Sequence, residues 1–183
     1  MSAKDIRGRL AESALRLLAR SSWQDLTLAA VARSAKVPLA SVRAHAPSKP
    51  SLIGLILQYT GDQAAVRYKK DRSSGAARDR IFDVVLTWLE VLGPRKAAVR
   101  SLYEGIGRDP LALAGARREL LAHAEWLLAL AEADTGRIVS VKAAALTLVL
   151  ARAVSVWLED DKQLTKTMAR IDGDLRRAGP LFS

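Results

Sequence analysis

Side chains that could bind phosphate groups or base edges gather in one short stretch, residues 37–52, which reads VPLASVRAHAPSKPSL. Arg43 and Lys49 carry charges that pair with phosphate oxygens, and a guanidinium group can also reach a guanine edge. Ser48 and Lys49 stand where a helix is expected to begin, and helix N-termini attract anions. We therefore expect this stretch to contact a polyanion.

The charge of the chain also favours a polyanionic partner. The formal net charge is +10, which fits a nucleic acid or an anionic membrane surface. Residues 1–55 hold nine Lys and Arg against three Asp and Glu, whereas residues 56–183 hold twenty against sixteen. Most of the excess therefore lies in the first third of the chain. An arginine-rich proteome would produce a basic protein anyway, so charge alone leaves both interpretations open.

Residues that would indicate an enzyme or a metal site are sparse. The chain has no cysteine, which excludes disulfides, a thiolate nucleophile and a cysteine zinc site, and fits a reducing cytoplasm. His45 and His123 lie far apart without ligand spacing, so we predict no metal site. The segment GIGRDP lacks the strand–turn–helix context of a nucleotide-binding loop. We expect no catalytic residue and no cofactor.

Length and hydropathy predict a globular protein of the cytoplasm. Half of the 183 residues are hydrophobic, which is enough for a sizeable core. The first ten residues, MSAKDIRGRL, lack the apolar core of a signal peptide. The longest apolar stretch, residues 138–158, is interrupted by Lys142 and Arg152. We predict a buried helix there and no integral membrane segment.

The elements that would position the phosphate-binding residues are helical, because no strand-like alternation occurs and Ala, Leu, Arg and Glu recur at helical spacing. We predict an all-α chain of about nine helices. Thr27 is the expected N-cap of the second helix and Ser48 that of the fourth. Pro38 fits the first turn of the third, where its missing N–H would be unpaired anyway. The expected helices span residues 7–20, 27–35, 37–45, 48–70, 76–92, 95–106, 109–133, 138–158 and 162–177.

The second and third of these helices are short and are separated by SAKV, which is helix-turn-helix spacing. The whole run of residues 9–53 resembles, without a gap, the TetR family of transcriptional regulators. The matching positions are Leu10, Ala14, Leu17, Leu18, Trp23, Thr27, Val31, Ala32, Ala35, Val37, Val42, His45, Pro47, Ser48, Lys49 and Leu52.

The resemblance implies a helix-turn-helix DNA-binding domain in residues 1–60 and a helical effector-binding and dimerisation domain in residues 61–183. It implies a homodimeric regulator, expected to be a repressor, that binds a double-stranded DNA operator and releases it when a small apolar effector binds. The third helix would enter the groove while residues at the helix starts bind phosphates. The DNA-binding residues implied in this way are Thr27, Pro38, Leu39, Ser41, Arg43, His45, Ser48 and Lys49.

Three positions depart from the family pattern, and many matches also have a purely structural interpretation. Lys36 stands where glycine is usual, and a left-handed backbone there would cost on the order of 1 kcal/mol. Arg43 replaces a phosphate-contacting tyrosine, a role that arginine can take over. Ala46 replaces a phenylalanine, which would lose about 2 kcal/mol of burial if nothing else filled the space. The apolar matches predict a three-helix core, which Trp23 is expected to plug.

Aromatic residues in the remaining two-thirds of the chain have two interpretations. Phe82, Trp88, Tyr103, Trp126 and Trp157 lie on different predicted helices. They could form the centre of an ordinary helical core. They could instead line an apolar pocket for an effector, and we keep them as ligand-binding candidates.

The last predicted helix also leaves alternatives open. Leu164, Met168, Ile171 and Leu175 make an apolar seam that could pair two copies of the chain or pack within one. Residues 156–178 are weakly similar to the C-terminal region of the lipid-binding coenzyme-Q biosynthesis family, which shares the TetR-like fold. The alternative function is therefore a lipid- or quinone-binding protein with a vestigial helix-turn-helix, acting at a membrane surface.

Overall fold

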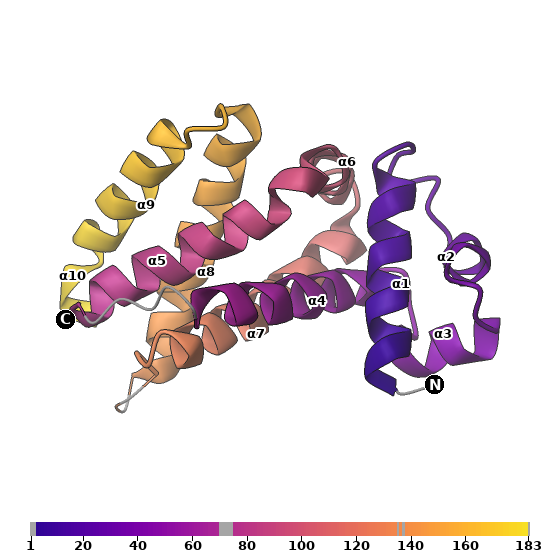
Figure 1. The fold of residues 1–183 in the computed structure, drawn as a ribbon, viewed down its shortest axis with the longest axis horizontal. Coiled ribbons are helices and arrows are strands. Elements are labelled where there is room, and N and C mark those ends of the chain that lie inside the picture. Colours follow the sequence, from indigo (N-terminus) through magenta and orange to yellow (C-terminus); the bar gives the residue numbers. More distant parts are fainter. Residues whose placement is uncertain (1–2, 70–74, 135, 137, 183) are drawn as a thin grey trace. The chain divides into compact units, whose positions relative to one another are not determined.

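The structure, a computed structural model, describes residues 3–69, 75–134, 136 and 138–182, and these residues form helices joined by short connections (Figure 1). The all-α prediction is confirmed, and the predicted count of about nine helices is close. The helices are α1 (Ala3–Leu18), α2 (Leu28–Ala35), α3 (Leu39–His45), α4 (Ser51–Tyr68), α5 (Ala77–Leu92), the 3-10 turn η1 (Gly93–Arg95), α6 (Lys96–Ile106), α7 (Pro110–Leu130), α8 (Val139–Glu159), α9 (Thr165–Arg177) and α10 (Gly179–Phe182).

Contacts divide the chain into two compact units. Unit 1 comprises residues 1–60 and 94–119, and unit 2 comprises residues 61–93 and 120–183. Unit 1 therefore contains α6 and the first part of α7 in addition to the helix-turn-helix. The assignment of DNA binding to residues 1–60 and of effector binding to residues 61–183 stays a prediction.

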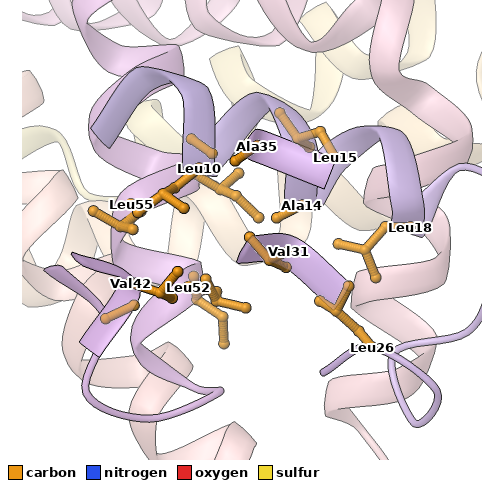
Figure 2. Packing of buried hydrophobic residues seen from close by; sticks show 14 of the residues in the cluster. Leu10, Ala14, Leu15, Leu18, Leu26, Val31, Ala35, Val42, Leu52 and Leu55 are labelled. Atoms are coloured by element: carbon orange, nitrogen blue, oxygen red, sulfur yellow. The ribbon is translucent and has the colours of Figure 1, made fainter. Parts of the chain in front are cut away.

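The core of unit 1 contains most of the apolar positions that matched the sequence pattern, together with others such as Leu15, Leu26 and Leu55 (Figure 2). Trp23 is completely buried in this core, as predicted. Helix α1 packs against α2, α3 and α6, and α2 packs against α3. Burial of these side chains supplies the main driving force for holding the short helix α3 in place. Residues with no exposed surface in this core include Leu10, Ala14, Val31, Val42, Ala46 and Leu52.

The turn between α2 and α3 has the left-handed backbone that glycine usually supplies. Lys36 has φ 53° and ψ 48°. Its N–H donates to the carbonyl of Arg33, and the N–H of Val37 donates to the carbonyl of Ala32, the two bonds of a Schellman motif. The guanidinium of Arg9 donates to the carbonyls of Ala35 and Lys36. The left-handed turn therefore forms with lysine, and its conformational cost stays a prediction.

Replacing Lys36 with glycine is expected to raise the free energy of unfolding by about 1 kcal/mol, because glycine has no Cβ to clash in the left-handed region. Chemical denaturation of the two proteins measures the difference. The Lys36→Ala variant is the matched control, since it removes the same charge but keeps the Cβ. A glycine variant no more stable than the alanine variant would contradict this account of the turn.

In unit 2 the predicted apolar seam of the last long helix faces its own chain. Ile171 and Leu175 are completely buried, and α9 packs against α8 and α5. Helix α9 starts at Thr165, three residues later than predicted. The buried carboxylate of Asp160 accepts hydrogen bonds from the backbone N–H of Thr167 at 2.7 Å and from its hydroxyl at 2.8 Å. For Ile171 and Leu175, packing within one chain is therefore the observed alternative, whereas Leu164 and Met168 are half-buried.

Helix α8 carries two different apolar faces. Leu146, Leu150 and Trp157 lie on the buried face. On the other face Val141 is 52% exposed and Leu148 is 62% exposed. The predicted buried helix is therefore buried along one side only. Among the helices that the structure describes, α8 alone is long and apolar enough to span a membrane, which is weak evidence because core helices of water-soluble proteins pass the same test.

Candidate nucleic-acid interface

Helix α3 is anchored by one side and open on the other. Val42 is completely buried, whereas Leu39 is 53% exposed. Within unit 1, the outward side of this short helix is therefore accessible to a binding partner. Among the residues predicted to contact DNA on this helix and at its start, Pro38, Leu39 and Arg43 are exposed, and Ser41 and His45 are half-buried.

The two predicted helix caps have different geometries. The exposed Thr27 accepts a hydrogen bond from the N–H of Ala30 at 3.1 Å and is the N-cap of α2, as predicted. Ser48 lies in a turn before α4, which starts at Ser51, and its hydroxyl is 2.8 Å from the hydroxyl of Ser51. Ser48 is therefore not the N-cap that was predicted. A turn precedes the helix instead, in which the N–H of Ser51 donates to the carbonyl of Ser48.

Lys49 lies over the buried indole of the loop between α1 and α2. Its Nζ is 4.7 Å from the centroid of the Trp23 ring, within the range of a cation–π contact. The same Nζ donates to the carbonyl of Gln24 at 3.1 Å. Burial lowers the pKa of Lys49, while Asp109 and Asp25 act in the opposite direction. An ammonium group has three N–H donors, so one bond to Gln24 leaves donors for a phosphate.

The indole of Trp23 is in turn bound by the start of α7. Its Nε1 donates to Oδ2 of Asp109 at 3.3 Å, and Oδ1 of the same carboxylate accepts from the N–H of Ala112 at 2.9 Å. The bond from Ala112, followed by the one from Trp23, lowers the pKa of Asp109. Asp109 is therefore the N-cap of α7, at the residue where this helix was expected to begin, and in addition a partner of Trp23.

Arg43 and Ala46, which stand where the family pattern has aromatic residues, lie in different environments. Ala46 is completely buried within the core of unit 1, so the core closes over the small side chain at the end of α3. Its N–H donates to the carbonyl of Val42 at 2.6 Å. Arg43 is exposed, the position required of a side chain that would replace a phosphate-contacting tyrosine.

Two of the predicted ligand-binding aromatics meet at a buried histidine in unit 2. The ring of His123 lies 4.9 Å from that of Trp88, tilted by 52°, and 6.0 Å from that of Trp126, nearly parallel. His123 is 5% exposed, and its Nε2 is buried without a hydrogen-bond partner in the described part of the chain. Burial lowers the pKa of His123 to about 4. A Cβ on Gly61 would lie 3.1 Å from Cε1 of His123, so α4 approaches closely there.

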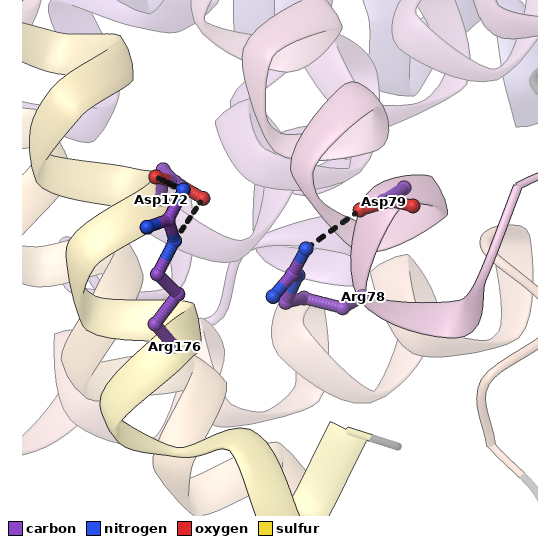
Figure 3. A network of polar contacts seen from close by, with 4 residues as sticks. All are labelled: Arg78, Asp79, Asp172 and Arg176. Atoms are coloured by element: carbon purple, nitrogen blue, oxygen red, sulfur yellow. Dashed lines mark hydrogen bonds and ion pairs between the residues drawn. The ribbon is translucent and has the colours of Figure 1, made fainter.

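The other three aromatic candidates lie elsewhere. Trp157 is buried on α8, and Tyr103 is 47% exposed in unit 1. Phe82 lines a cleft of about 390 Å³ together with Met168 and Leu175. The walls of this cleft carry two ion pairs, Arg78 with Asp79 at 3.3 Å and Arg176 with Asp172 at 2.9 Å (Figure 3). The five aromatics therefore do not share one cavity.

Gly105, Asp109 and His123 take part in these arrangements but were not among the predicted site residues. A Cβ on Gly105 would overlap the Cβ of Trp23 and lie 2.9 Å from its Cγ. The sequence offered a signal for Asp109, whose position before Pro110 marks a helix start. For Gly105 no local pattern exists, since its partner Trp23 is far away in sequence. In the described residues no group of three acidic, histidine or cysteine side chains could hold a metal ion.

Comparisons with known proteins find similarity in structure. No family model matches the sequence, and no curated protein matches it. A TetR transcriptional regulator from Rhodococcus sp. RHA1 superposes with a TM-score of 0.64 at 18% identity, covering 94% of both chains. The TetR transcriptional regulator from Nitrosomonas europaea ATCC 19718 gives a TM-score of 0.64 at 20% identity, covering 94% of this chain and 97% of the other.

These comparisons bear out the resemblance to TetR proteins at the level of the fold, over nearly the whole length of the chain. The weaker likeness to the coenzyme-Q biosynthesis family is not borne out by them. Together with the short helix α3 that follows the turn at Lys36, they lead to one structural conclusion: this chain has the fold of the TetR-family transcriptional regulators.

Proposed function

We propose that this chain is a DNA-binding transcriptional regulator, acting as a homodimeric repressor in the cytoplasm. The observation that carries the proposal is the outward face of α3, which is open while its inner face is anchored by the buried Val42. A helix held in this way can enter the major groove. The basic excess of residues 1–55 supports the proposal, since phosphate contacts supply most of the affinity of such proteins for DNA.

In this proposal the predicted DNA-binding residues divide into two groups. Thr27, Ser48 and Lys49 contact phosphates from the starts of α2 and α4, and Arg43 takes the place of the missing tyrosine. Leu39 and its small neighbours on α3 face the bases, where apolar contact with thymine methyl groups is the available form of recognition. The DNA is expected to be a pseudo-palindrome, because a two-fold dimer reads two related half-sites. No step of this function is catalytic.

Gel shifts of fragments from upstream of the protein's own gene test the proposal. We expect one fragment to bind specifically and its affinity to fall steeply with salt, as counterions are released from the DNA. Arg43→Ala and Lys49→Ala should each weaken binding, and each should reduce the slope of log affinity against log salt by about 0.9. Lys162→Ala is the matched control, since it removes one exposed cation outside the proposed interface.

The outcome that would reverse the proposal is equally defined. A chain that binds no fragment specifically but copurifies with a lipid and binds liposomes would be a lipid- or quinone-binding protein instead. Unchanged affinity of both alanine variants for a specific fragment would remove the roles assigned to Arg43 and Lys49 alone.

The exposed apolar face of α8 is the surface that we propose for dimerisation. Val141 and Leu148 are more than half exposed on this helix, and Ala144 and Ala151 are exposed between and beyond them. The spacing of these four residues places them along one side of a helix. Small residues among larger apolar ones allow two helices to approach closely. A second copy of the chain, presenting the same face, would remove this apolar surface from water.

Leu148→Glu is expected to convert the dimer into a monomer, because it places a charge in the proposed apolar interface. Sedimentation equilibrium measures the mass directly. Since Leu148 is 62% exposed, the variant should keep its fold. Leu111→Glu is the matched control: Leu111 is 80% exposed on α7, and its replacement should leave the oligomeric state unchanged. A dimer that persists in Leu148→Glu contradicts the assignment of this face.

For the effector we propose a small apolar molecule bound in unit 2 beside the aromatic cluster of Trp88, His123 and Trp126. Indole faces bind planar apolar groups, and the unpartnered Nε2 of His123 is available to one polar group of the ligand. By reciprocal coupling, such binding would weaken operator affinity. A compound that releases DNA from the wild-type protein but not from His123→Leu would support this position.

A further inference from the structure

Residues 105–110, the segment GIGRDP, connect α6 to α7, and we call them the α6–α7 corner. This corner contacts the loop that carries Trp23. Gly105 lies so close to Trp23 that no larger residue fits. Gln24 donates from its side chain to the carbonyl of Gly105 at 3.3 Å, and Ser101 donates to the carbonyl of Ser21 at 2.8 Å. All of these residues belong to unit 1. The corner therefore fixes both the backbone of the loop and the indole.

Asp109 makes the most specific of these contacts, because its two carboxylate oxygens have separate partners. Oδ1 caps α7 through the N–H of Ala112, and Oδ2 accepts the indole N–H of Trp23. A helix cap alone needs one oxygen, which serine, threonine or asparagine supplies as well. The second oxygen holds the indole N–H by a hydrogen bond, in addition to the packing of Gly105 and the cation–π contact of Lys49.

The exposed edge of this arrangement is the place where Lys49 lies. Its ammonium group is over the Trp23 ring and is bonded to the carbonyl of Gln24. Both partners of Lys49 are therefore residues that the corner holds. A lysine side chain is long and loses rotational freedom about several bonds when it is fixed. An ammonium group that is already held in place therefore binds a phosphate with less loss of entropy than a mobile one.

We infer that Asp109 and Trp23 are positioning residues that hold the ammonium group of Lys49 in place for a DNA phosphate. The inference rests on the proposed DNA-binding function and extends it to the α6–α7 corner, outside the helix-turn-helix. In this inference Asp109 and Trp23 increase the affinity for DNA indirectly, through Lys49, and neither of them contacts the DNA.

The sign of one mutational effect separates positioning from simple electrostatics. Asp109 is an anion close to the proposed phosphate site, so on charge alone its removal would strengthen DNA binding. If Asp109 instead acts by positioning, its removal weakens binding. Asp25 is the matched control, because it also acts electrostatically on Lys49 while its side chain bonds Ser22 and has no bond to Trp23.

The experiment measures the affinity of full-length variants for a mixed-sequence DNA duplex over a range of salt. Asp109→Ser keeps the cap of α7 and is expected to weaken binding about threefold to tenfold, whereas Asp25→Ser leaves it equal or stronger. In the Lys49→Ala background, Asp109→Ser should cause no further loss, since the residue acts through Lys49. The inference would be overturned if the fold losses of affinity from the two single variants multiplied in the double variant. Stronger DNA binding by Asp109→Ser would overturn it as well.

A second measurement, made without DNA, tests the positioning of Lys49 independently of whether the protein binds DNA. The Hε proton resonances of Lys49 should be shifted by the ring current of Trp23 in the wild-type protein. They should move toward the values of a free lysine in Asp109→Ser and in Trp23→Phe, which lacks the indole N–H. If no variant binds DNA, the proposed function fails and the resonances alone decide. Unchanged Lys49 resonances in both variants would overturn the positioning role.

Discussion

Replacing Gly105 with alanine is expected to lower the free energy of unfolding by about 3 kcal/mol, the upper part of the range for overpacked cores. The added Cβ would overlap the Cβ of Trp23, which is completely buried and cannot withdraw. Either the α6–α7 corner or the indole must shift, and the hydrogen bonds of Trp23 with Asp109 and of Gln24 with Gly105 would be strained. Urea denaturation followed by circular dichroism measures the change.

Gly107 supplies the control for this prediction. It belongs to the same corner, its backbone is right-handed helical with φ −61°, and the nearest atoms to an added Cβ lie at 3.7 Å. Gly107→Ala should therefore leave the free energy of unfolding within about 0.5 kcal/mol of that of the wild type. Equal stability of the two alanine variants would mean that the close packing of Gly105 on Trp23 is absent.

Acidification is expected to remove about 3 kcal/mol of stability between pH 7 and pH 4 through His123 alone. Its pKa is about 4 in the folded chain, whereas an unfolded histidine has a pKa of about 6.5. Between these values the unfolded state binds more protons, so stability is present above about pH 6.5 and is lost as the pH falls. The cause is burial between Trp88 and Trp126, where an imidazolium ion would lose its hydration.

The pH dependence attributable to His123 is measured as a difference between two proteins. Free energies of unfolding at a series of pH values are compared for the wild type and His123→Gln, which cannot titrate. The difference between them should change by about 3 kcal/mol over this window, whatever the stability of the variant at pH 7. Parallel curves for His123→Gln and the wild type would contradict a neutral, buried His123.

Features specified by neighbouring residues could be predicted from the sequence. The caps Thr27 and Asp109 marked the starts of α2 and α7 correctly, since a cap acts on backbone groups two or three residues away. The left-handed turn at Lys36 was indicated only by the resemblance, because glycine is usual at that position in the family pattern. The start of α9 was predicted three residues early, because a turn precedes Thr165 and Asp160 accepts the backbone N–H of Thr167 across it.

The parts of the candidate site that escaped prediction depend on contacts between distant residues. Trp23 and Asp109 are 86 residues apart, and nothing near either one indicates that they meet. His123 was considered only as a metal ligand, whereas its surroundings are two indoles, one of them contributed by α5. The apolar seam of the last helix could not be assigned to a partner by periodicity, because a buried face has the same spacing whether it meets its own chain or another.

The central claim is that the outward face of α3 reads duplex DNA, in two copies of this chain related by a two-fold axis. Footprinting of the bound upstream fragment by hydroxyl radicals tests it most directly. The account predicts two protected half-sites with related sequences on one face of the duplex, centred about 10 base pairs or a multiple of that apart. Protection without such paired half-sites, or no protection at any salt concentration at which the protein is folded, would contradict it.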